Sequence, residues 1–126
     1  MSGAEVAASG PETVTRVGLV SGVKTDLAIT QYSDKTLLHL TQLGKFGSWL
    51  QVERQTVRKG DFVDNAAKHV YEATVLLGQD TEELQFLART LAEKLNIAKP
   101  LVISVGVKNL TVALALELVQ FISENI

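Results

Sequence analysis

The side chains best suited to chemistry in this chain are two histidines, His39 and His69, and the chain contains no cysteine. A histidine becomes a metal ligand or a general base when a carboxylate or a second ligand lies at a suitable spacing, and neither histidine has such a partner. Both fall in segments that read as β-strands, so we interpret them as ordinary strand residues. The lack of cysteine excludes disulfides, thiolate zinc sites and thiol catalysis. We therefore expect no catalytic residue, no metal and no cofactor.

Glycine-rich and acidic segments add no catalytic motif. Gly44-Lys45-Phe46-Gly47 resembles a phosphate loop only superficially, because no helix follows it directly and the helix dipole is missing. We interpret this segment as a hairpin turn between two strands. Gly78-Gln79 does precede a helix, but Asp80 is expected to occupy that helix N-terminus as its cap. The pair Glu82-Glu83 fits an acidic, solvated first turn.

The composition is that of one globular domain. Of the 126 residues, 46% are hydrophobic and 21% are charged, which is too apolar for a disordered chain. The net charge of −2 and the scattered basic residues argue against nucleic-acid binding. No apolar run is long enough to span a membrane, and the N-terminus lacks the features of a secretory signal. We expect a disordered tail at 1–12, a single domain at 13–126, no membrane association, and a cytoplasmic location with the nucleus as an alternative.

Hydrophobic periodicity predicts five strands, a helix, a sixth strand and a second helix. Alternating, β-branched segments place the first five strands at 13–20, 23–32, 35–43, 48–56 and 68–77, with Ser21-Gly22 as a hairpin turn. Asp80 and Glu83 form an expected capping box for a helix whose leucines recur at helical spacing. The segment 101–107 is apolar on both faces, which is typical of an interior strand. Asn109 is expected to cap a last helix that begins near Leu110.

This order, βββββαβα, favours an α+β fold with a mostly antiparallel six-stranded sheet and two main helices on one face. The last helix is apolar around most of its circumference, and the strands leave few wholly polar faces. Such an excess of apolar surface marks an association site, and a face-to-face sheet dimer would cover it. The residues expected at this dimer or partner surface are Leu38, Leu40, Leu50, Val52, Val75, Leu116 and Val119.

Two blocks of the sequence resemble a known family. These are Thr41-Gln42-Leu43-Gly44-Lys45-Phe46-Gly47 and Glu72-Ala73-Thr74-Val75-Leu76-Leu77-Gly78-Gln79-Asp80, followed by an amphipathic helix, a strand and an apolar helix. The pattern is similar to that of the proteasome assembly chaperone 3 family, and it extends over about residues 13–126. Within it, the block Val75 to Asp80 is the specific part. Both blocks serve here as markers of the fold and not as contact residues.

The resemblance implies a non-enzymatic chaperone with a mostly antiparallel sheet and two main helices. Members of that family pair with a related small partner, proteasome assembly chaperone 4, and help to build the α-subunit ring of the 20S core particle. They contact an α-subunit, leave before the particle matures, and can self-associate through their sheets. The charged loop 57–65 is the candidate for the α-subunit contact, through Arg58, Lys59, Asp61, Phe62 and Asp64.

Two other classes of function remain open at this point. A small dimeric scaffold of a signalling or trafficking complex would also combine a sheet with flanking helices. An enzyme or ligand-binding domain would require a deep polar pocket in which His39 or His69 lies beside a carboxylate.

Overall fold

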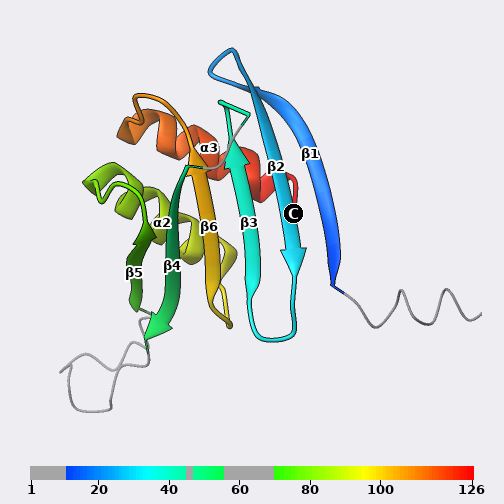
Figure 1. Cartoon of the computed structure of the whole chain (residues 1–126), viewed down its shortest axis with the longest axis vertical. Helices are drawn as coiled ribbons and strands as arrows, with labels where there is room; N and C mark the ends of the chain where they lie inside the picture. The colour runs from blue at the N-terminus through cyan, green and yellow to red at the C-terminus, as the bar shows by residue number, and fades with distance from the viewer. Residues whose placement is uncertain (1–10, 45–46, 56–69) are drawn as a thin grey trace, which may run out of the picture.

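One six-stranded sheet and two helices make up the computed structural model, which describes residues 11–44, 47–55 and 70–126 (Figure 1). Both helices lie on the same face of the sheet, so the expected α+β fold and the order βββββαβα are confirmed. The elements are β1 (Glu12–Val20), β2 (Val23–Gln31), β3 (Thr36–Thr41), β4 (Ser48–Gln55), β5 (Val70–Leu77), α2 (Glu82–Leu95), β6 (Leu101–Gly106) and α3 (Val112–Glu124).

The strands lie in the order β1-β2-β3-β6-β4-β5, so the late strand β6 is inserted between β3 and β4. All neighbouring pairs are antiparallel except β3 and β6, which run parallel with Leu38 opposite Ile103. The expected interior position of β6 is confirmed. The expected hairpin at 44–47 is wrong, because β3 and β4 are not neighbours in the sheet and β6 lies between them.

The turn at Ser21-Gly22 is the hairpin that the sequence predicts. Ser21 and Gly22 have φ values of 53° and 77°, and Val20 pairs directly with Val23 on either side of them. Two successive residues with positive φ are the signature of a type I′ turn, whose twist matches that of the flanking strands. This short connection fixes the register along the whole of β1 and β2.

The core lies between the sheet and the two helices. Side chains alternate along each strand, so every second residue of β2, β3, β6 and β4 points toward the helices. The helices close this layer with one apolar stripe each. The largest fully buried side chains include Leu27, Leu38, Leu40, Leu50, Val52, Leu87, Leu91, Leu101, Ile103, Leu118 and Ile122.

The N-caps of the two helices lie one and two residues later than expected. Thr81, not Asp80, caps α2, because its hydroxyl accepts a hydrogen bond from the Leu84 amide at 3.2 Å. Thr111, not Asn109, caps α3 and accepts from the Leu114 amide at 3.1 Å. A threonine side chain at the N-cap accepts a hydrogen bond from the backbone amide three residues later, which has no partner within the helix. Both threonines also have the extended backbone that an N-cap needs. The predicted capping box of Asp80 and Glu83 is therefore wrong.

None of the helices in the described part of the chain is long and apolar enough to cross a membrane.

Candidate protein-binding surfaces

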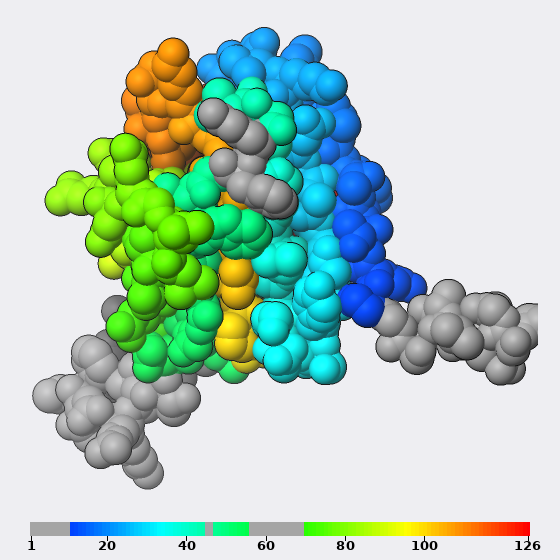
Figure 2. All heavy atoms as spheres, in the orientation of Figure 1, coloured from blue at the N-terminus to red at the C-terminus, as the bar shows by residue number. Residues whose placement is uncertain are grey.

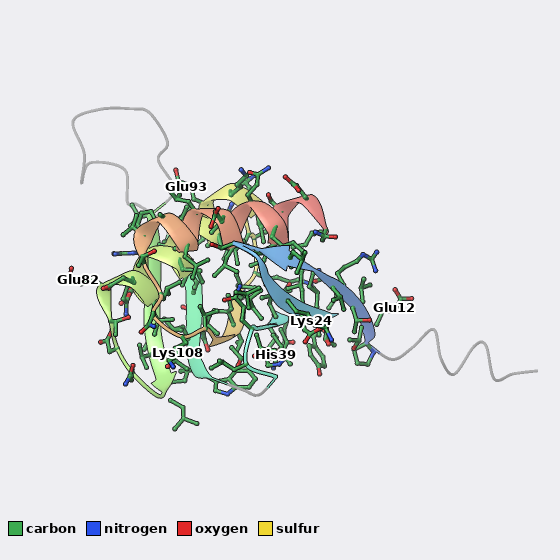
Figure 3. The ribbon with its side chains drawn as sticks, turned by 90° about the horizontal axis from the view of Figure 1, so that it is seen from above. Glu12, Lys24, His39, Glu82, Glu93 and Lys108 are labelled. Carbon is green, nitrogen blue, oxygen red and sulfur yellow. The ribbon has the colours of Figure 1, made fainter. Side chains whose placement is uncertain are left out.

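His39 lies half-buried on β3, on the side of the sheet away from the helices (Figure 3). Its neighbours across the strands are Ala28 on β2 and Ser104 on β6. Partial burial lowers the pKa of His39, while the charge of Asp26 acts in the opposite direction. Among the described residues, no three metal-ligating side chains come together. The structure thus places His39 on a sheet surface, and His69 lies outside the described residues.

The first motif block ties four strands together at one end of the sheet. The Gln42 side-chain amide donates to the Val20 carbonyl at 3.2 Å and to the Thr25 hydroxyl at 2.9 Å. The Thr41 hydroxyl donates to the Gly106 carbonyl at 3.3 Å. These two side chains therefore link the end of β3 to the β1–β2 hairpin and to β6.

Glycines in the two motif blocks permit close passage of the chain past neighbouring strands. A Cβ on Gly47 would collide with the Val105 carbonyl and lie 2.6 Å from the Gly106 Cα. Gly78 has a φ of 99°, and a Cβ there would lie 2.6 Å from the Ser48 hydroxyl. That hydroxyl accepts a hydrogen bond from the Gln79 amide at 3.0 Å. The motif residues thus act as determinants of the fold, consistent with their use as fold markers.

Most residues expected at a partner surface lie instead in the core. Leu38, Leu40, Leu50 and Val52 are fully buried beneath the helices, and Val119 is 2% exposed. The four strand residues alternate with outward-facing neighbours and point toward the helices, and Val119 lies on the side of α3 that faces the sheet. The structure therefore corrects this prediction. Val75 is partly buried against the same core.

Leu116 is the exception, with half of its side chain exposed on α3. The rest of the expected excess on this helix is mostly covered, because Ala115, Leu118 and Ile122 pack into the core. The loop residues Arg58, Lys59, Asp61, Phe62 and Asp64 lie outside the described residues.

The side of the sheet away from the helices carries exposed apolar surface, but it is formed by other residues than those expected from the sequence. We call this side, which faces the viewer in Figure 2, the open face. Strand pairing and alternation place four half-buried apolar residues on four neighbouring strands across its middle: Ala28, Leu37, Val102 and Trp49. Toward the edges, Val17 on β1 and Leu76 on β5 are 64% and 53% exposed.

Polar side chains surround this apolar band. They include Asp26, Gln51, Glu53, Thr74 and Glu72, while His39 and Ser104 lie within the band, in the same row as Ala28 and Trp49. A signal for the band is present in the sequence, because Leu37-Leu38 and Val102-Ile103 are adjacent apolar pairs. Alternation requires one member of each pair to face away from the core. The open face is the surface best suited to bind another protein through a sheet.

Comparisons with known proteins give first the class of fold. A chain from the crystal structure of a chaperone complex for yeast 20S proteasome assembly superimposes with a TM-score of 0.68. The match covers 90% of this chain and 97% of that chain, at 14% sequence identity. The two chains therefore share the same fold.

Sequence comparisons identify the family. The profile of the proteasome assembly chaperone 3 family matches residues 38–125. A protein of Nematostella vectensis named proteasome assembly chaperone 3 is 29% identical over 96 residues, which cover 72% of this chain and 71% of that protein. The chain therefore belongs to the proteasome assembly chaperone 3 family.

Proposed function

We propose that this protein is a non-enzymatic, cytoplasmic chaperone that assists assembly of the 20S proteasome α-subunit ring, and that it works as a dimer with a related small chaperone. Membership of the family supports the role in proteasome assembly. The structural observation that carries the proposal is the open face. Its apolar band lies in the middle of the sheet and has no helix over it (Figures 1 and 3).

A second sheet is the partner that fits this surface best. The open face is broad and formed by regular strands, and two such faces can pack about 10 Å apart. Its central residues Leu37, Val102 and Trp49 are half-buried in the single chain, and a facing sheet would complete their burial. The polar residues around them would form the rim of the interface, as in most protein–protein contacts.

The proposed contact with an α-subunit has to be weaker and reversible. A chaperone that leaves the maturing particle needs a contact of limited area, below about 1,200 Å² in total. The charged loop 57–65 remains a sequence-based candidate for such a contact. Its five named side chains combine both charges with one phenylalanine.

Substitutions on the open face test the dimer. We expect Val102→Glu and Leu76→Glu to abolish the heterodimer formed on co-expression with the related chaperone of the same organism, because each introduces an unpaired charge into an apolar contact. Leu43→Glu provides the matched control, since Leu43 is 47% exposed in the turn after β3 and not on the band. The measurement is the mass by light scattering after size-exclusion chromatography.

Thermal unfolding must show that each variant remains folded. Leu76 is more exposed than Val102, so its variant keeps the test valid if the substitution in the central strand disturbs folding. A heterodimer of unchanged mass and affinity in a folded Leu76→Glu variant would contradict the proposed interface.

A further inference from the structure

The helix side of the molecule carries an excess of negative charge. Helices α2 and α3 together contain five glutamates but only two basic residues, Arg89 and Lys94. The charges on β1, β2 and β4 balance within each strand. Glu82 and Glu93 mark the helix side in Figure 3, opposite His39. Most of the acidic character of the described chain therefore lies on the side away from the open face.

A groove of about 410 Å³ lies on this side, between α3 and the end of β1. Leu116 and Phe121 on α3 supply its apolar lining, and Leu116 is 50% exposed. Leu19 only borders the groove from the edge strand β1, where its side chain alternates with that of the buried Val20. Its volume is within the range of pockets that bind small molecules, so it can admit at least one large side chain.

The wall of the groove is held in place by packing between α3 and β1. The ring of Phe121 lies directly over Gly18, where a Cβ would come within 2.6 Å of the ring. Because Gly18 has no side chain, the aromatic ring can rest on the strand backbone. The groove is therefore a fixed feature of the α3–β1 contact.

Acidic side chains on α3 flank the apolar lining. Glu117 and Glu124 both line the groove, two helical turns apart. Between them, the Gln120 amide donates to Glu124 at 2.6 Å, and the Gln120 carbonyl oxygen accepts from the Lys94 ammonium at 2.9 Å. Among the described residues, no cation lies within ion-pair distance of either glutamate. A basic side chain on a partner would complement these charges.

We propose that this groove binds a segment of an unassembled proteasome subunit in which an apolar side chain lies next to a lysine or arginine. The apolar side chain would pack on Leu116 and Phe121, and the basic group would pair with Glu117 and Glu124. This inference rests on the proposed function and specifies which surface meets the subunit. Since the groove and the open face lie on opposite sides of the sheet, one chain can bind a partner chaperone and a subunit together.

Binding of individually purified proteasome α-subunits of the same organism to the chaperone heterodimer tests the proposal. We expect Glu117→Lys with Glu124→Lys to weaken the affinity of the subunit that binds by about tenfold or more, because close opposite charges become like charges. Leu116→Ala should weaken it as well, by loss of apolar contact. Affinity for the wild-type protein should fall as salt is raised, and the double variant should lose most of that dependence.

The control variants match the test variants in chemistry. Glu93→Lys makes one such charge reversal on α2 outside the groove, half the charge change of the double variant, and Leu43→Ala removes an equally exposed leucine elsewhere. Neither should change subunit affinity by more than about twofold. The heterodimer should keep its mass in all four variants.

The outcomes separate the two proposals. If no α-subunit binds the wild-type heterodimer, both the proposed function and the groove are overturned. If a subunit binds, but the double variant and Leu116→Ala bind it as tightly as their controls, only the groove is overturned. The proposed function would then stand with another contact surface.

Discussion

Gly47 shows how closely the chain passes over the end of β6. A methyl group at this position would meet the backbone at Val105 and Gly106, which cannot move aside as a flexible side chain could. The sequence marks Gly47 as special through its place in a motif, but the usual reason for a loop glycine is a positive φ in a tight turn. The actual reason is contact with a strand almost sixty residues later, which no local pattern reveals.

The substitution Gly47→Ala is therefore expected to destabilise the protein by about 2–3 kcal/mol, because the added atom forces backbone movement. Gly44→Ala is the control. Gly44 has a φ of 74°, and apart from its chain neighbours no atom of the described residues lies within 4 Å of where its Cβ would be, so only the conformational cost of about 1 kcal/mol applies. Urea-induced unfolding measures both changes. Equal effects of the two substitutions would show that crowding at β6 is unimportant.

At the scale of single elements, sequence patterns locate the strands and helices well. Every strand and helix forms within a few residues of its expected place, since alternation and helical spacing are local signals. Strand order is not local. The glycines between β3 and β4 favour a hairpin on local grounds, and only the insertion of β6 overrides that preference. The position of each helix start is ambiguous in the sequence, because two residues near it are both good N-caps: Asp80 and Thr81 before α2, and Asn109 and Thr111 before α3.

The helix starts give a direct prediction. Thr81→Ala should lower the free energy of unfolding by about 1 kcal/mol, because the Leu84 amide loses its hydrogen-bond acceptor. Asp80→Ala should have a much smaller effect, since within the described part of the chain the Asp80 carboxylate accepts one hydrogen bond, from the exposed Gln85 side chain at 3.2 Å. Thermal unfolding of the two variants, compared with wild type, provides the measurement. A larger loss for Asp80→Ala would place the cap one residue earlier.

At the scale of the whole molecule, the question is which side of the sheet faces a partner. Composition and the apolar strands indicate more apolar surface than two helices can cover. They do not show which of the two alternating sets of side chains in each strand faces the helices. From the sequence alone, either Leu37 or Leu38 could be the core residue. Leu38 is buried because α2 and α3 cover its side of the sheet. The groove at α3 was beyond prediction, because it joins residues from opposite ends of the chain.

The late entry of β6 into the middle of the sheet has a consequence for synthesis on the ribosome. Until residues 101–106 emerge, β3 and β4 cannot join into one sheet, and each exposes an unpaired edge. Long-range pairing of this kind slows folding and favours aggregation of the incomplete chain.

We therefore expect a chain that ends at Lys99 to be degraded rapidly by protease, and a chain that includes β6 and α3 to become resistant only after both elements have left the ribosome. Protease digestion of stalled and released nascent chains measures this difference. Resistance of the shorter chain would mean that β3 and β4 find another arrangement. Rapid degradation of the shorter chain would show that the sheet forms only once β6 has been synthesised.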